Sequence, residues 1–203
     1  MKRDLRRYIE IARNLLVDLR YGAYLGRPTG SRFDHLGAHP VAHTDYRVLR
    51  AIFRDRPIEG EVLVDVGCGK GRVIHYWLSR GFKNRLIGIE LDAEIAAQVR
   101  KRLRRFANVE IVAGSAVENL PTDGTVFFLS NPFDKKVILQ FKRSIAERSS
   151  PATLLYYNSV HVEAFRDDPA WLVEEIDLAA RLPKAYVSST NRVLPFAVLR
   201  FVS

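Results

Sequence analysis

The chain has 203 residues, of which 47% are apolar and 27% are charged, which suits one globular domain with a sizeable core. It contains no run of about 18 apolar residues, and its charged N-terminus lacks the apolar stretch of a signal peptide, so we expect neither a membrane span nor secretion. The single cysteine, Cys68, excludes an internal disulfide, and we expect a cytoplasmic location. A net charge of +9 favours an anionic partner without choosing among nucleic acid, acidic protein and membrane surface, and basic proteins with no such partner are equally common.

The first 57 residues are predicted to form N-terminal helices and a cap segment ahead of the main unit, 58–203, in one compact domain. Residues 1–20 have the spacing of an amphipathic helix, with an apolar stripe of Leu5, Ile9, Ala12, Leu16 and Leu19. We expect this stripe to pack on the domain, and binding to an anionic membrane or to nucleic acid is the alternative. Residues 21–40 are rich in glycine and proline and predict a loop, and residues 44–53 predict a helix capped by Thr44 or Asp45.

From residue 61 onward, short apolar runs alternate with helical patterns. The predicted strands are 61–66, 85–90, 109–113, 126–130, 153–157, 172–176 and 194–202, and the predicted helices between them are 72–80, 93–106 and 135–147. Such alternation predicts an α/β fold with a doubly wound, mostly parallel, seven-stranded sheet.

A glycine-rich loop follows the first of these strands. The apolar run 62–66 ends in Gly67, Gly69 and Gly71, and in an open α/β sheet ligands bind where the strands end. Arg72 stands where a dinucleotide-binding loop needs its third glycine, and Val64 stands where a phosphate-binding P-loop needs its first. The spacing therefore disfavours both of these nucleotide classes.

An acidic residue follows the second strand at the matching place. Glu90 lies 19 residues after Gly71, and a carboxylate about 20 residues past such a loop accepts hydrogen bonds from ribose hydroxyls. The alternative is a tight turn and an unrelated surface acid. Together, the loop and Glu90 predict a ligand that contains a ribose.

The sequence from Asp65 to Gly71, Asp-Val-Gly-Cys-Gly-Lys-Gly, resembles the first motif of class I S-adenosylmethionine (SAM) methyltransferases. The resemblance implies a Rossmann-like methyltransferase fold with a final antiparallel strand and SAM as the cofactor. A carboxylate at Asp65 suits the cationic amino acid part of SAM. The residues that the resemblance places at the cofactor are Asp65, Gly67, Cys68, Gly69, Gly71, Arg72, Glu90, Leu91, Ser115, Ala116 and Asn131. Ser115 stands where most family members carry an aspartate for the adenine amino group.

The tripeptide Asn131-Pro132-Phe133 follows the fourth strand, which lies beside the first in the doubly wound order. It is similar to the Asn-Pro-Pro-aromatic motif of methyltransferases that act on adenine or glutamine, but the second proline is missing. It also resembles a group of bacterial methyltransferases distantly akin to the lysine methyltransferases that modify histones outside their tails. The resemblance implies that Asn131 and Pro132 position the acceptor in catalysis and that Phe133 packs against the acceptor or SAM. The alternative is a turn that ends a strand.

Tyr46 and Asn158 are the candidate substrate-binding residues, with an ordinary buried tyrosine as the alternative for Tyr46. Because Gly37 and Pro40 interrupt the histidines at 35, 39 and 43, we expect no metal site. The expected acceptor is a nitrogen, in a protein lysine or a small amine, and the amino group of a nucleic-acid base is the second choice. Other classes stay open, namely a SAM-binding module without catalysis and a nucleic-acid-binding protein. The sequence leaves the oligomeric state undetermined.

Overall fold

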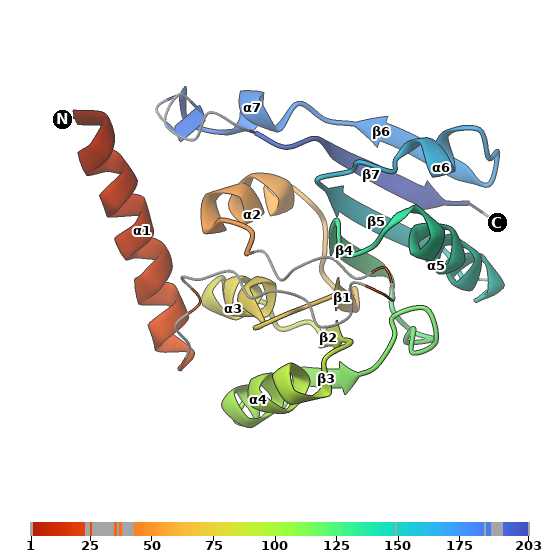
Figure 1. Ribbon diagram of the computed structural model, residues 1–203, viewed down its shortest axis with the longest axis horizontal. Coiled ribbons are helices and arrows are strands. Elements are labelled where there is room, and N and C mark those ends of the chain that lie inside the picture. Colours follow the sequence, from red (N-terminus) through yellow and green to blue (C-terminus); the bar gives the residue numbers. More distant parts are fainter. Residues whose placement is uncertain are drawn as a thin grey trace.

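The computed structural model describes residues 2–22, 25, 35, 37, 43–148, 150–184, 186–187 and 193–202. Its centre is a seven-stranded sheet in the order β3-β2-β1-β4-β5-β7-β6 (Figure 1). The strands are β1 (Leu63–Val66), β2 (Leu86–Glu90), β3 (Val109–Ala113), β4 (Val126–Ser130), β5 (Ala152–Tyr157), β6 (Trp171–Glu175) and β7 (Phe196–Phe201). β7 runs antiparallel to its neighbours β5 and β6, whereas β1 to β5 pair in parallel. The predicted fold class is confirmed.

The register brings the ends of the five parallel strands to one edge, which we call the carboxyl edge. Val66 pairs with Ile89 on one side and with Leu129 on the other, and Leu129 pairs with Tyr156. The loops that follow these strands therefore meet along this edge, which is where open α/β sheets bind ligands.

The helices are α1 (Lys2–Arg20), α2 (Tyr46–Phe53), α3 (Arg72–Ser79), α4 (Ala93–Leu103), α5 (Lys135–Glu147), α6 (Glu163–Arg166) and α7 (Leu178–Arg181). Successive strand side chains point to opposite faces, so each buried strand contributes to two cores. Phe128 of β4 belongs to the core that includes α2, α3 and α4, and its neighbours Phe127 and Leu129 belong to the core that includes α5 and α6. These strands are continuous apolar runs because helices cover both faces of the sheet.

Most predicted bounds agree with the structure. The bounds of β3, β4 and α5 match the predictions, and Asp45 caps α2 by accepting a hydrogen bond from the backbone N–H of Arg47. Differences of one to three residues occur at the ends of several other elements, which is the usual uncertainty of element ends. The short helices α6 and α7 were not predicted.

The predicted orientation of α1 is wrong. Ile9, Ala12, Leu16 and Leu19, which were expected to face the domain, are exposed. The helix packs instead through its other side, where Asp18 is buried against the first residue of α3. This ion pair joins Asp18 to Arg72, which is 54 residues further along the chain, so helical spacing cannot predict it. The side chain of Leu5 lies outside the described residues, as does most of the predicted loop 21–40.

Within the described ranges, every helix is too short or too polar to cross a membrane.

Candidate cofactor and acceptor site

The glycine-rich loop leaves β1 at the carboxyl edge and turns directly into α3. The backbone N–H groups of Gly67 and Cys68 both donate to the Ile89 carbonyl oxygen at 2.9 Å, which ties the loop to the end of β2. Gly67 has a φ of +71°, and a Cβ at this position would lie 2.8 Å from Cβ of Pro132. A side chain is therefore excluded here by both backbone strain and contact. The contact also brings the loop against the tripeptide that follows β4.

Glu90 lies beside this loop with both carboxylate oxygens bound to backbone. Oε2 accepts from the N–H of Gly69 at 2.7 Å, and Oε1 accepts from the N–H of Asp92 at 2.9 Å. A carboxylate offers about four acceptor positions, so these backbone contacts leave room for a ribose hydroxyl. Burial raises the pKa of Glu90, and its backbone hydrogen bonds oppose that rise.

Asp65 lies inside β1 with a polar atom that has no partner. It is almost fully buried, and its Oδ2 makes no hydrogen bond to any described residue. Burial, followed by the nearby Glu90 carboxylate, raises the pKa of Asp65 well above its usual value. A buried and unpaired carboxylate is costly unless a cation or a hydrogen-bond donor reaches it. The ammonium group of SAM supplies both, so the residues present fit this cofactor.

Cys68 lies within the loop and Arg72 follows it, and neither side chain is a reactive group of the site. Burial raises the pKa of the Cys68 thiol well above its usual value, which keeps it protonated and poorly nucleophilic. The Arg72 guanidinium turns away and binds Asp18, with Nη2 2.5 Å from Oδ2. If Arg72 contacts the cofactor directly, it does so through its backbone at the start of α3.

The end of β3 provides Ser115 and Ala116. The N–H of Gly114 donates to the Glu90 carbonyl oxygen at 2.9 Å, which brings these residues next to Glu90, the residue predicted to bind ribose. Ser115 Oγ accepts from the N–H of Val117 at 3.2 Å, so its hydroxyl proton remains able to donate. Ala116 is buried, while Leu91 is half-buried after Glu90. Their cofactor roles stay predictions.

Two asparagines with left-handed backbone end the neighbouring strands β4 and β5. Asn131 has a φ of +47° and Asn158 has a φ of +54°, conformations that asparagine adopts more readily than most residues. The hydroxyl of Tyr156 donates to Oδ1 of Asn131 at 3.3 Å. This bond defines the orientation of the Asn131 amide, because the side-chain oxygen faces the donor.

The other two residues of the tripeptide point in different directions. Pro132 lies against Gly67, as described above, between the two loops. The ring of Phe133 packs on Phe141 of α5, with 5.7 Å between ring centroids. Phe133 therefore anchors the tripeptide to the core, and contact with an acceptor stays a prediction.

Tyr46 and the residues before it lie next to the end of β4 and the start of α3. The Tyr46 hydroxyl donates to Oδ1 of Asp18 at 2.6 Å, so its polar end is engaged within the protein. Thr44 Oγ1 donates to Oγ of Ser130, the last residue of β4, at 3.1 Å. Burial and the charges of Arg72 and Lys70 lower the pKa of His43 to about 3. Sequence reasoning did not assign Thr44 to the site, because a contact across 86 residues leaves no local signal.

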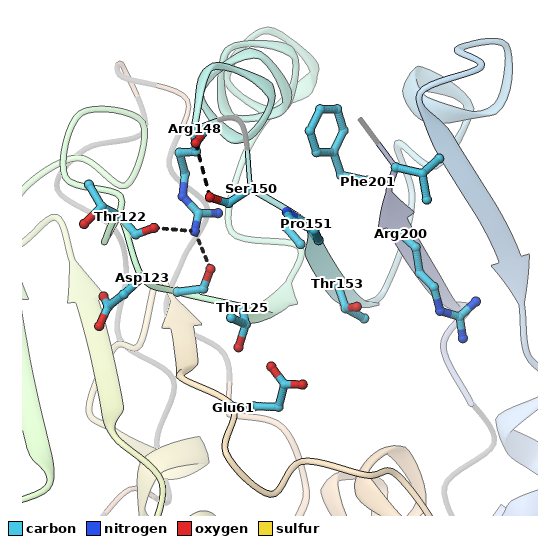
Figure 2. A pocket seen from close by; sticks show the side chains of 13 residues that line it. Glu61, Thr122, Asp123, Thr125, Arg148, Ser150, Pro151, Thr153, Arg200 and Phe201 are labelled. Carbon is cyan, nitrogen blue, oxygen red and sulfur yellow. Dashed lines mark hydrogen bonds between the residues drawn. The ribbon is translucent and has the colours of Figure 1, made fainter.

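A cavity of about 450 Å³ lies at the opposite edge of the sheet, where β1, β4 and β5 begin (Figure 2). Its charged lining includes Glu61, Asp123, Arg148 and Arg200. Arg148 donates to the carbonyl oxygens of Thr122 and Gly124, and Arg200 contacts Glu174 at 3.3 Å. None of the predicted site residues lines this cavity, so we locate the site by its chemistry at the carboxyl edge.

Residues 63–146 match a protein family described as a methyltransferase domain. Among similar solved structures is an RNA methyltransferase from Salinibacter ruber bound to S-adenosyl-L-homocysteine. It is 22% identical, with a TM-score of 0.55, over 79% of this chain and 92% of that one. A structure described as an O-methyltransferase from Klebsiella pneumoniae is 16% identical, with a TM-score of 0.59, over 95% and 89%. The phosphoethanolamine N-methyltransferase 1 of Haemonchus contortus is 12% identical, with a TM-score of 0.55, over 76% and 42%. A search of curated proteins found no match.

Proposed function

We propose that this chain is a SAM-dependent methyltransferase and that it transfers a methyl group to a nitrogen acceptor in a protein lysine or a small amine. The observation that carries the proposal is Asn131 at the end of β4. Its backbone is left-handed, its side-chain oxygen binds the Tyr156 hydroxyl, and the next residue lies against the glycine loop.

In this proposal Asn131 orients the acceptor. One lone pair of Oδ1 is used by Tyr156, and the second can accept an N–H from the acceptor nitrogen. That contact directs the nitrogen lone pair toward the glycine loop on the far side of Pro132. When bound, SAM supplies a methyl group on a sulfonium that leaves as a neutral thioether. Alignment is the main requirement, since a neutral amine already has its lone pair free.

The histidines beside the glycine loop favour nitrogen over a hydroxyl acceptor. A hydroxyl must lose its proton, which calls for a base with a pKa near the working pH. Burial lowers the pKa of His43 to about 3, and it lowers the pKa of His75 to about 3 as well. Both are too weakly basic for that role, whereas a lysine or alkylamine that has lost its proton to water attacks through its lone pair and needs no base in the protein.

The test replaces Asn131 and measures SAM binding and turnover separately. Asn131→Gly keeps the positive φ and removes the amide, and Asn131→Ala adds backbone strain. We expect calorimetric SAM affinity to change little and methyl transfer from radiolabelled SAM to amine and lysine-peptide acceptors to fall about 100-fold. Asp55→Gly, at another residue with positive φ (+57°), is the matched control and should retain full turnover. Unchanged turnover in Asn131→Gly would remove the role given to Asn131.

Tyr156→Phe tests the orientation of the amide. The variant removes the hydroxyl that binds Asn131 and leaves the buried ring. We expect kcat to fall several-fold with SAM affinity unchanged, because Tyr156 acts through Asn131. A fall in SAM affinity with no change in kcat would contradict this.

A second candidate is methylation of an amino group on a nucleic-acid base. The net charge of +9 and the similarity to an RNA methyltransferase support it. The same assay with RNA and DNA separates the two acceptors, because labelled methyl groups appear in only one of them. A SAM-binding module without catalysis predicts that no acceptor is methylated, although SAM binds.

A further inference from the structure

The outward side of α1 is apolar along its described length. Tyr8, Ala12, Leu16 and Leu19 recur at spacings of four, four and three, so they form one stripe on a helix. Tyr8 and Leu16 are each 68% exposed, and Leu19 is 55% exposed. Ile9 and Ile11 are exposed on either side of the stripe. Without Ala12, these residues are five of the nine large exposed apolar side chains among the described residues.

The helix cannot turn this stripe inward, because its opposite side is engaged. Asn14 donates to Oδ2 of Asp45 at 2.7 Å, and Asp18 binds Arg72 and Tyr46. Tyr21, just past the helix, stacks on His75 of α3 with 5.1 Å between ring centroids. Figure 1 shows α1 along one side of the molecule, next to α2 and α3, which fits this arrangement. The apolar stripe therefore belongs to the surface of the folded protein.

The charge of the helix identifies what the stripe can bind. The sequence Lys2–Arg20 contains six basic and three acidic residues, and one of those acids, Asp18, is buried in an internal ion pair. Arg13 and Arg20 are exposed and lie four residues after Ile9 and Leu16, at one border of the stripe. A second copy of this chain would bring the same positive helix and a second net charge of +9. A nucleic acid would complement the charge but leave the apolar stripe in water.

We propose that the outward side of α1 docks on an anionic lipid membrane. A helix with an apolar stripe, basic flanks and low overall hydrophobicity lies in the plane of the lipid headgroups. The Asp18–Arg72 ion pair connects α1 to the residue that follows the glycine loop. Docking would therefore hold that loop within about two helix diameters, roughly 20 Å, of the lipid surface. The proposal is independent of the acceptor proposed above.

The test is co-sedimentation of the full chain with vesicles. We expect binding to vesicles of phosphatidylcholine and phosphatidylglycerol in equal parts, weak binding to pure phosphatidylcholine, and loss of binding as salt is raised. The double variant Leu16→Glu/Leu19→Glu should bind at least about tenfold more weakly. The matched control is Val160→Glu/Leu172→Glu, which changes two apolar side chains of similar exposure, 53% and 54%, away from α1. It should bind as the parent does.

Folding is checked by thermal denaturation and SAM titration, which both variants should leave unchanged because all four positions are exposed. Failure of the parent chain to bind anionic vesicles overturns the proposal, and so does equal binding by the two double variants. A dimer in light scattering that Leu16→Glu/Leu19→Glu breaks, without vesicle binding, would assign the stripe to a second copy. Binding to RNA that is insensitive to these two leucines, again without vesicle binding, would assign α1 to nucleic acid.

Discussion

Two buried aspartates of this protein differ in their hydrogen-bond partners. Asp18, at the end of α1, is 1% exposed and binds the Arg72 guanidinium and the Tyr46 hydroxyl. Asp65, in β1, is 3% exposed, and its Oδ2 has no hydrogen-bond partner among the described residues. The first carboxylate is satisfied within the fold, whereas no residue in the described ranges bonds Oδ2 of the second.

We interpret the difference as that between a structural carboxylate, Asp18, and a carboxylate predicted to bind the cofactor, Asp65. An ion pair that is fully hydrogen-bonded offsets the cost of burying its charges, and Asp18 uses it to attach α1 to α3. A buried carboxylate without a partner keeps that cost in the free protein, and a cationic ligand recovers it on binding. The pKa of Asp65, raised by burial and by Glu90, reports the same cost. Changing each aspartate to asparagine should therefore have opposite effects on stability.

The largest effect is expected for Asp18→Asn. The variant leaves the Arg72 guanidinium buried with no opposite charge and weakens the attachment of α1. Breaking one side of a buried ion pair costs about 3–5 kcal/mol, so we expect a clear fall in the free energy of unfolding in urea. The control is Glu110→Gln, which removes an exposed partner of Arg85 and should cost at most about 1 kcal/mol. Equal losses in the two variants would mean that Asp18 contributes no more than a surface pair.

Asp65→Asn is expected to act in the other direction. It replaces a buried carboxyl, whose raised pKa shows that ionisation is costly there, with a neutral amide of nearly the same volume, so the free protein should become more stable by about 1–3 kcal/mol. SAM should bind at least about tenfold more weakly, because its ammonium group loses its carboxylate partner. Thermal denaturation with and without SAM, together with calorimetry, measures both quantities. A less stable free protein, or an unchanged SAM affinity, would make Asp65 a structural residue like Asp18.

The pH dependence of SAM binding sharpens the same contrast. The pKa values of Asp65 and Glu90 are both raised in the free protein, so each carboxyl holds its proton to a higher pH than in the unfolded chain. Their contribution to stability is therefore complete below the unfolded pKa of about 4 and is lost as pH rises through the raised folded values.

A cationic ligand favours the ionised carboxylates, so SAM affinity should rise with pH through the same window, by up to about tenfold per pH unit for each proton released. Calorimetry in buffers of different ionisation enthalpy measures the number of protons that are released when SAM binds. Asp65→Asn should release fewer of them, whereas a flat profile in the parent would exclude coupling between the carboxyls and SAM.

The contrast also shows what could be predicted from the sequence. The glycine spacing, Glu90 and the strand pattern depend on neighbours along the chain. The place of β4 beside β1 and the bounds of β3, β4 and α5 were predicted correctly. The orientation of α1 depends on Asp18 meeting Arg72, 54 residues away, and the apolar stripe pointed to the wrong side. The bond from Tyr156 to Asn131 likewise joins two strands through side chains that carry no sequence signature. Local pattern predicts elements, and long-range polar contacts decide which side of an element is buried.

Tyr46→Phe is expected to lose less stability than Asp18→Asn. The variant removes the hydroxyl that donates to Asp18 at 2.6 Å but leaves both Arg72 contacts and the buried ring, whose centroid is 5.5 Å from the Arg72 guanidinium carbon. One hydrogen bond to a charged acceptor contributes about 1.5–3 kcal/mol, so urea denaturation should show a loss smaller than that of Asp18→Asn. In a double-mutant cycle, Tyr46→Phe should cost less when Asp18 is already asparagine, because the acceptor is then uncharged. If the two losses simply add, Tyr46 does not act through Asp18.

Tyr46 was also predicted to bind the substrate. If the KM for the methyl acceptor rises in Tyr46→Phe while SAM affinity stays unchanged, the Tyr46 hydroxyl has that second role.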